Sequence, residues 1–207
     1  MPRSTHGFGP VYDGSSRILI LGSFPSVKSR EDGFYYAHPR NRFWPLLARL
    51  LGEPEPATVE EKKRLVLSHG IALWDVAESC EVRGSGDNTI REVTPVAIRE
   101  LLAAAPIEQV CCNGATAWAL YMEYLYPITE LPAVKLPSTS PANAQCTLEV
   151  LERKWRAAME AGPKKPSADP FGADDSCAPA DPFGDPEYAP RARRKTARDA
   201  DSWTEPC

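Results

Sequence analysis

Residues 22–44 carry the densest set of side chains that could do chemistry. The segment reads GSFPSVKSREDGFYYAHPRNRFW and combines aromatic rings with a histidine, an asparagine and several cations. Aromatic rings stack on nucleobases and cations attract phosphates, so this mixture is typical of proteins that recognise single bases or single strands. The cations are Lys28, Arg30, Arg40 and Arg42, and the asparagine is Asn41. The segment therefore predicts a local nucleic-acid site.

A competing interpretation concerns the start of this segment, where Lys28 and Ser29 follow Gly22 at a spacing close to that of a phosphate-binding P-loop. Val27 occupies the position of the second P-loop glycine, and a β-branched residue disfavours the backbone conformation needed there. Pro25 removes one of the N–H donors that would surround a phosphate. We therefore interpret residues 22–29 as a strand-to-loop turn. An ATPase or kinase stays as an alternative that nucleotide-binding measurements would exclude.

Composition limits the class of protein. The chain has 207 residues, 43% of them hydrophobic, which suits one well-packed domain of about 100–200 residues. Its net charge of -4 gives no global attraction to nucleic acid, so any such site is a local patch. The six cysteines form no CxxC pair, and we predict reduced thiols, no metal and no cofactor. With neither a signal peptide nor an apolar run of roughly 20 residues, we expect an intracellular protein without membrane contact, cytoplasmic or nucleoid-associated in a prokaryote and nuclear in a eukaryote.

The chain changes character near Gly162. Residues 163–207 are rich in Pro, Asp and Ala and poor in aliphatic residues, so we predict a folded domain over residues 1–162 and a disordered tail over 163–207. The tail contains ADPFG twice and a basic RARRK at 191–195. A docking signal for an unknown protein partner and a chance repeat both fit the first feature. A nuclear address, a DNA-contacting arm and a solvated charge run all fit the second.

The folded part reads as alternating strands and helices. Short apolar runs predict strands, helical periodicity with caps predicts helices, and their alternation predicts an α/β fold. We expect a three-layer α/β/α arrangement with a central, mostly parallel four-stranded sheet. The expected strands are 17–22, 71–76, 107–114 and the run from 133, and the expected helices are 42–52, 58–70, 94–105, 115–126 and 147–161. Ligands bind beyond the carboxyl ends of such strands, which selects the loops 22–44, 75–94, 113–115 and 137–143.

Five motifs in this order resemble the uracil-DNA glycosylase superfamily. They are GSFPS after the first strand, YYAHPRNRFW, ALWDV, CCNGATA and LPSTSPAN. The pattern is most similar to the deoxyinosine (hypoxanthine)-DNA glycosylase branch. The stretch AHPRNRFW also resembles mismatch-specific uracil and thymine glycosylases, which carry an HPxNxFW-type segment. The resemblance covers about residues 10–160 and implies base flipping, stacking of the base on an aromatic ring and hydrolysis of its N-glycosidic bond.

The same resemblance implies roles for residues of the first loop. Tyr36, directly before AHP, matches the base-stacking aromatic, and the backbone of Gly22, Ser23 and Phe24 would line the base pocket. Mismatch-specific relatives place a water-orienting asparagine where this chain has Phe24. We therefore predict that Asn41 positions the water, while a purely structural amide before Phe43 and Trp44 is the alternative.

Later loops supply the remaining candidates. An ionised Asp75 would accept N1–H of hypoxanthine or, equally, N3–H of uracil, or it caps the next segment. Asn113 faces the pocket or forms a turn. Contacts to DNA phosphates are predicted for Lys28, Arg40, Ser138, Ser140 and Asn143. A lyase would need a pocket lysine as nucleophile, and only Lys28 and Lys135 lie near, so we expect a monofunctional enzyme.

Three hypotheses follow from these patterns. The first is a DNA glycosylase that removes a deaminated base, hypoxanthine ahead of uracil or mismatched thymine. The second is the nucleotide-binding P-loop protein. The third is a module that binds damaged DNA without cleaving it. For the first, the expected partner is double-stranded DNA, with single-stranded DNA as an alternative, and the expected state is a monomer.

Overall fold

The computed structural model describes residues 3–82 and 89–162. Its centre is a parallel sheet of four strands in the order β3 (Ile71–Asp75), β2 (Ile18–Gly22), β6 (Gln109–Asn113) and β7 (Ala133–Leu136). Every neighbouring pair in this sheet is parallel. The predicted four strands and their parallel arrangement are confirmed. The tail over 163–207, with its ADPFG and RARRK motifs, lies outside the described residues.

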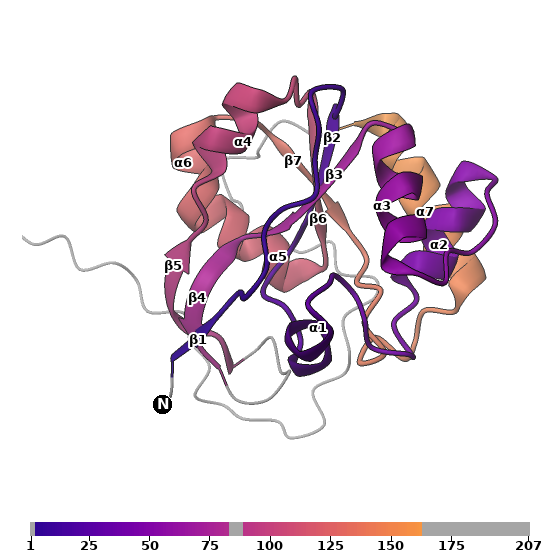
Figure 1. The fold of residues 1–207 in the computed structure, drawn as a ribbon, viewed down its shortest axis with the longest axis horizontal. Helices are drawn as coiled ribbons and strands as arrows, with labels where there is room; N and C mark the ends of the chain where they lie inside the picture. Colours follow the sequence, from indigo (N-terminus) through magenta and orange to yellow (C-terminus); the bar gives the residue numbers. More distant parts are fainter. Residues whose placement is uncertain (1–2, 83–88, 163–207) are drawn as a thin grey trace, which may run out of the picture. The chain divides into compact units, whose positions relative to one another are not determined.

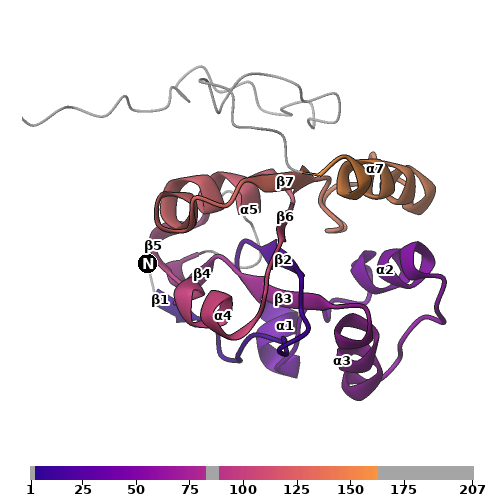
Figure 2. The same ribbon diagram turned by 90° about the horizontal axis from the view of Figure 1, so that it is seen from above.

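Helices cover both faces of this sheet (Figures 1 and 2). On one side lie α2 (Phe43–Leu51), α3 (Val59–Ser68) and α7 (Leu148–Ala161). On the other lie α4 (Ile98–Ala104), α5 (Ala115–Leu120) and α6 (Tyr126–Thr129), with a π-helical turn at Tyr121–Leu125 between the last two. The predicted three-layer architecture is therefore present. In the described part of the chain, no helix is long and apolar enough to cross a membrane.

The cap expected from the sequence at the start of α3 is present in the structure. Thr58 accepts a hydrogen bond from the Glu61 N–H at 3.1 Å, and the Glu61 carboxylate accepts the Thr58 N–H at 3.0 Å. These two bonds form a capping box at the start of α3 and satisfy backbone donors that the helix leaves open. They also lower the pKa of the Glu61 carboxyl.

A second sheet was not expected from the sequence. It is antiparallel and runs in the order β1 (Arg3–Thr5), β4 (Ala77–Glu81) and β5 (Arg91–Pro95). The predicted helix start at Thr94 is wrong, because Thr94 pairs with Ser79 of β4 and the helix begins only at Ile98. The β4–β5 pairing uses backbone groups that a helix starting at Thr94 would need.

The predicted loop 22–44 also contains a short helix, α1 (Val27–Asp32). Ser26 begins it, since its hydroxyl accepts the Ser29 N–H at 3.2 Å. Gly33 ends it with φ of 66°, a left-handed conformation that glycine adopts without steric cost. The turn at 22–27 is thus closed by a serine cap, and Val27 is the first helical residue.

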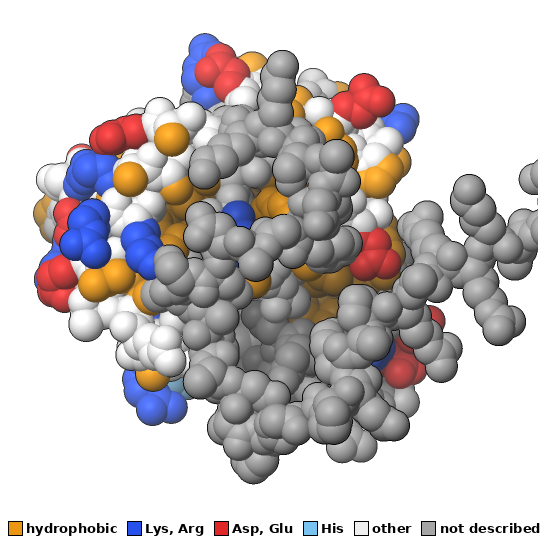
Figure 3. Space-filling view, turned by 180° about the vertical axis from the view of Figure 1, so that it is seen from behind, with side chains coloured by type: hydrophobic (Ala, Val, Ile, Leu, Met, Phe, Trp, Pro, Cys, Tyr) orange, Lys and Arg blue, Asp and Glu red, His pale blue; other side chains and the backbone are white. Residues whose placement is uncertain are grey.

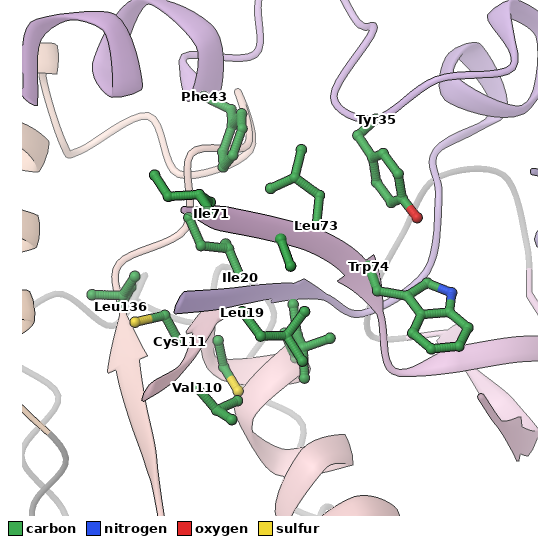
Figure 4. Close-up of a cluster of buried hydrophobic side chains, with 14 of the residues drawn as sticks. Leu19, Ile20, Tyr35, Phe43, Ile71, Leu73, Trp74, Val110, Cys111 and Leu136 are labelled. Carbon is green, nitrogen blue, oxygen red and sulfur yellow. The ribbon is translucent and has the colours of Figure 1, made fainter. Parts of the chain in front are cut away.

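The hydrophobic core lies between the parallel sheet and its helices (Figure 4). The side chains of Leu19, Ile20 and Leu21 are completely buried, as expected for a strand covered on both faces. Phe43 and Tyr35 pack on the opposite side of β3 from Val110. On the visible part of the face drawn in Figure 3, acidic and basic side chains lie side by side. This core fixes the strand ends from which the functional loops leave.

Candidate active site at the carboxyl edge of the sheet

Strand register brings four predicted loops together. Gly22 at the end of β2 pairs with Asp75 at the end of β3, and Asn113 at the end of β6 pairs with Leu136 at the end of β7. A cavity of about 290 Å³ opens at this edge. Nine of the predicted site residues line it: Gly22, Ser23, Phe24, Tyr36, Asn41, Asp75, Asn113, Ser138 and Ser140.

Gly22 is required by close packing against the Asp75 carboxylate. A Cβ atom at position 22 would lie 2.0 Å from Asp75 Oδ1 and 3.3 Å from the Tyr36 hydroxyl oxygen. A real Cβ does not approach an oxygen so closely, so only glycine leaves room for both groups. The Asp75 side chain therefore lies against the Gly22 backbone, and the N–H groups of Val76 and Ala77 donate to the carbonyls of Gly22 and Ser23 instead of to Asp75.

Tyr36 forms an aromatic wall. Its ring stacks on Phe43 with centroids 3.8 Å apart and planes 19° apart, and Phe43 is fully buried. Tyr36 has φ of 53°, in the left-handed region that costs a non-glycine residue about 1–2 kcal/mol. Because Phe43 supports one face of the ring, Tyr36 is held as a rigid surface beside Asp75 and Asn41 in the cavity lining.

Asn41 has both a structural contact and access to the cavity. Its Oδ1 atom accepts the Phe43 N–H at 3.0 Å, directly before α2 begins. The residue is half-buried and lines the cavity. The structural role considered from the sequence is thus present in a residue that also lines the cavity. The role of water positioner stays a prediction.

The side chain of Phe24 supplies no polar atom to the cavity. It is 8% exposed, and the guanidinium carbon of Arg30 lies 5.1 Å from the centre of its ring. Arg30 also donates to the carbonyl oxygen of Pro25 at 2.6 Å. The Phe24 side chain is therefore a packed aromatic wall, and a side-chain amide that orients a water must come from another residue, such as Asn41 of the same 22–44 loop.

The loop over residues 137–143 is held by two devices that the sequence did not reveal. The first is a reciprocal pair, in which Asn113 Nδ2 donates to the Thr139 hydroxyl at 2.9 Å and the Thr139 N–H donates to Asn113 Oδ1 at 3.0 Å. Thr139 is completely buried. Asn113 lines the cavity, but both polar atoms of its amide are used to hold Thr139 of this loop.

The second device is the Arg42 guanidinium. It donates to the carbonyl oxygens of Ser140 at 2.6 Å and Asn143 at 2.9 Å, and also to those of Thr139 and Cys146. An arginine fork suits several acceptors arranged around it, and each bond satisfies a carbonyl of an irregular loop. From the sequence, Arg42 was only one of several cations; in the structure its guanidinium holds the backbone of this loop.

Three predicted DNA-binding residues lie outside the cavity lining. Lys28 forms an ion pair with Asp32 at 2.6 Å, which raises the pKa of the lysine. Arg40 is exposed, and Asn143 donates to the Ser138 carbonyl at 2.9 Å. Lys135 lies over the Trp118 ring at 5.6 Å, away from the cavity lining.

His6 is the main site residue that sequence reasoning missed. Its Nε2 atom lies 2.8 Å from Asp75 Oδ2, and both residues are buried. Tyr35, which also lines the cavity, donates its hydroxyl to the Gly9 carbonyl at 3.1 Å. Burial, with the charge of Asp75 second, raises the pKa of Tyr35, so this hydroxyl stays protonated. A lone histidine before the first motif gave no signal in the sequence.

The chemical capacity of the site follows from these groups. The cavity combines an aromatic wall, an amide and a buried carboxylate with the hydroxyls of the 137–143 loop. Over residues 3–82 and 89–162, no group of three or more His, Cys, Asp or Glu side chains is arranged to hold a metal ion. Such an arrangement suits a flat, hydrogen-bonding heterocycle inside the cavity and an anion at the loop.

Comparisons with known proteins agree with this reading. The family model described as the uracil DNA glycosylase superfamily matches residues 9–159. A hypoxanthine DNA glycosylase of Methanosarcina acetivorans is 35% identical over 153 residues, which are 73% of this chain and 95% of that protein. A hypoxanthine DNA glycosylase of Methanosarcina barkeri is 37% identical over 87 residues, which are 42% of this chain and 55% of that protein.

A solved structure has the same fold. The solution NMR structure of a candidate uracil DNA glycosylase from Methanosarcina acetivorans superposes with a TM-score of 0.62 and 31% sequence identity. The match covers 75% of this chain and 98% of that one.

Proposed function

Because the chain belongs to the uracil DNA glycosylase superfamily, we propose that it is a monofunctional DNA glycosylase that removes hypoxanthine from deoxyinosine sites in DNA. The observation that carries this proposal is the single cavity lined by Tyr36, Asn41 and Asp75. These residues supply, in one place, a stacking surface, an amide and a hydrogen-bond acceptor. The product is an abasic site, the substrate of the later steps of base excision repair.

Base recognition uses the wall and the floor of the cavity. A flipped base stacks on the Tyr36 ring, whose other face is supported by Phe43. Asp75 accepts the N1–H of hypoxanthine on its Watson–Crick edge. Stacking alone tolerates any base, so the hydrogen bond to Asp75 supplies the selectivity.

Bond cleavage needs a positioned water more than a strong base. The transition state resembles an oxocarbenium ion, so a water held on the far side of C1′ attacks as the bond to N9 breaks. Asn41 holds that water through its side-chain amide. The water oxygen forms the new bond to C1′, the glycosidic electron pair leaves with the base, and one water proton ends on the departing base.

Phosphate contacts surround the cavity. The hydroxyl oxygens of Ser138 and Ser140 accept the N–H groups of Ser140 and Ala142, so each O–H group is oriented and can donate to a phosphate oxygen. Arg40 and Lys28 add positive charge at the exposed rim. When DNA binds, Lys28 leaves its ion pair with Asp32 and contacts a phosphate instead. We infer that the protein acts as a monomer on double-stranded DNA within the cell.

A uracil or mismatch glycosylase is the second candidate. The same acceptor on Asp75 fits the N3–H of uracil as well as the N1–H of hypoxanthine, so this contact does not choose between the two bases. The cavity of about 290 Å³ sets no sharp lower limit on the size of the base.

The deciding experiment measures base excision directly. Duplexes carrying a single inosine, uracil, ethenoadenine or G:T mismatch are incubated with the protein and then treated with alkali to reveal abasic sites. We expect the highest rate at inosine, a lower rate at uracil and no strand break without alkali. Faster cleavage at uracil would favour the second candidate. Tight binding to inosine duplexes without any abasic product would replace the enzyme with a damage-binding module.

A further inference from the structure

His6 is fixed beside Asp75 by backbone pairing. It follows β1 directly, and its N–H donates to the Glu78 carbonyl of β4 at 2.8 Å. β4 begins two residues after Asp75, so the β1–β4 pairing returns the first strand to the carboxyl end of β3. The histidine side chain is 0% exposed and Asp75 is 3% exposed. The 2.8 Å contact between His6 Nε2 and Asp75 Oδ2 is therefore shielded from water.

The surroundings of His6 leave Asp75 as its polar partner. The ring centroid lies 4.5 Å from that of Phe8, 5.8 Å from that of Tyr35 and 6.5 Å from that of Phe24. Among the described residues, His6 Nδ1 has no hydrogen-bond partner. A buried N–H without an acceptor is costly, so the tautomer that fits carries its proton on Nε2 and donates it to Asp75.

The hydrogen bond from His6 determines which oxygen of Asp75 is left for a ligand. Oδ2 is occupied by His6, and Oδ1 lies against the Cα of Gly22, where any Cβ atom would collide with it. Gly22 and Asp75 both line the cavity. The oxygen that His6 does not hold is therefore Oδ1, which lies beside Gly22 of the cavity lining, and the carboxylate cannot rotate without breaking its contact with His6.

The contact between His6 and Asp75 orients the Asp75 carboxylate more than it stabilises the fold. Placing a histidine and a carboxylate among aromatic rings carries a desolvation cost, and apolar side chains of similar size would fill such a space at least as well. The gain from the contact is a single orientation of Asp75 in the absence of a ligand. Preorganised polar groups in a site shielded from water discriminate strongly between ligands.

We propose that His6 is a positioning residue that makes Asp75 a selective reader of deaminated bases. The inference rests on the proposed function and extends it to the origin of selectivity. Deamination of adenine to hypoxanthine turns ring atom N1 from an acceptor into an N–H donor, and deamination of cytosine to uracil does the same at N3. The fixed acceptor bonds to the deaminated base and repels the lone pair of the parent base. Guanine carries its own N1–H and is not discriminated by this contact.

The test compares two substrates that differ in the ring atom at position 1. In 1-deazahypoxanthine a C–H group replaces N1–H and the compensating proton sits on N3 or on the 6-oxygen, so the base keeps its outline and loses the donor at position 1. Single-turnover excision rates are measured for duplexes carrying each base. We expect wild type to prefer hypoxanthine by about 10- to 100-fold, the range for a hydrogen bond to a buried charged group. The ratio of the two rates, rather than either rate alone, is the readout.

Variants of His6 then separate positioning from packing. His6→Phe keeps a ring in the aromatic enclosure and removes the donor, and we expect the preference to fall by about tenfold. His6→Gln retains an N–H at similar reach and should restore most of it. His69→Phe, at the end of α3 and outside the cavity lining, is the matched control and should leave the ratio unchanged. An unchanged ratio in folded His6→Phe would overturn the proposal.

A second variant covers the case in which His6→Phe does not fold. In Asp75→Asn, His6 would hold the amide oxygen and turn the NH₂ group toward the cavity, so the site would offer a donor. Affinity should then shift from hypoxanthine toward adenine in duplexes with the base unpaired. A variant that still prefers hypoxanthine as strongly as wild type would contradict the orienting role.

The two proposals fail in different ways. If wild type excises none of the bases, the proposed function is wrong, and the affinities for the hypoxanthine and 1-deazahypoxanthine duplexes replace the rates as the test of His6. If wild type excises hypoxanthine and the substrate ratio does not respond to His6, the enzyme stands and the positioning role is lost.

Discussion

The two sides of the cavity are built in different ways. The base side, formed by Gly22, Tyr36 and Asp75, depends on single contacts between buried groups: one ring stack, one carboxylate and one position without a Cβ atom. The loop side, residues 137–143, is held by several hydrogen bonds that Arg42 donates to its backbone carbonyls and by the Asn113–Thr139 pair. Substitutions on the base side should therefore change which base is processed and how fast. Substitutions on the loop side should change stability and DNA affinity.

Asn41, which lines the same cavity, should give the largest effect. Asn41→Ala removes the amide proposed to hold the water, and we expect excision of hypoxanthine to slow by about 10²–10³-fold, as for loss of a positioned polar group in other enzymes. It also removes the bond to the Phe43 N–H, which should lower the free energy of unfolding by about 1 kcal/mol. Single-turnover kinetics and urea denaturation measure the two losses separately.

Asn41→Asp is the matched variant, because a carboxylate accepts the Phe43 N–H as well as an amide does. Stability near that of wild type with strongly reduced excision would confirm a role in chemistry. Excision close to wild type in Asn41→Ala would remove Asn41 from the mechanism and leave it as a structural residue, whereas excision retained in Asn41→Asp alone would show that a carboxylate can hold the water in place of the amide.

On the base side, Gly22→Ala tests the dependence on a single close approach. The added Cβ would lie 2.0 Å from Asp75 Oδ1, so the carboxylate must move. Displacement of a reading group by about 1 Å costs roughly 10²-fold in rate, and we expect a loss of that order at hypoxanthine. Gly14→Ala adds a methyl group where no atom lies within 4 Å and serves as control. Full activity of Gly22→Ala would show that the site tolerates a displaced Asp75.

On the loop side, Arg42→Lys keeps the charge and loses the fork that reaches several carbonyls. We expect the free energy of unfolding to fall by about 2 kcal/mol, and the loop to bind DNA less well with the hypoxanthine-to-uracil preference unchanged. Arg49→Lys, whose ion pair with Glu149 is exposed, should change stability by less than about 0.5 kcal/mol. A changed base preference in Arg42→Lys would break the division between the two sides.

The smallest effect should come from the exposed rim. Lys28→Ala removes one proposed phosphate contact, so affinity should fall a few-fold for every duplex, and the slope of log affinity against log salt should decrease by about 0.9. Filter binding or anisotropy over a range of salt concentrations gives the slope. Arg153→Ala, on α7 outside the cavity lining, should leave it unchanged. An unchanged slope for Lys28→Ala would place the lysine away from DNA.

The four parallel strands could be predicted because each contains a short run of buried apolar residues, interrupted in β7 by the exposed Lys135. Residues 18–22 and 71–75 show this pattern without interruption. The antiparallel sheet escaped prediction because β1 and β5 are short, polar and largely exposed, so no periodicity marks them. Thr94 and Pro95 have the composition of a helix start, and only their pairing with β4 shows that they form a strand.

Prediction of the site succeeded where residues lie at strand ends and failed where contacts cross the fold. Gly22, Asp75 and Asn113 follow from strand register, which a sequence of apolar runs already implies. The contact of His6 with Asp75 and the bonds from Arg42 to the 137–143 loop join segments far apart in the chain. Nothing in the local sequence around His6 indicates its partner, because the pairing of β1 with β4 alone brings it there.

The pairing of β1 with β4 also has a consequence for the order of folding. The parallel sheet takes no residue from segment 3–6, so its strands can associate without that segment. Arg3 meets Glu81 only after the intervening chain has closed into a long loop, and such closure carries an entropic cost that delays non-local contacts. We therefore expect the cavity to acquire its histidine late in refolding, after the sheet has formed. A refolding intermediate would then have a formed sheet and a base pocket that does not yet discriminate between bases.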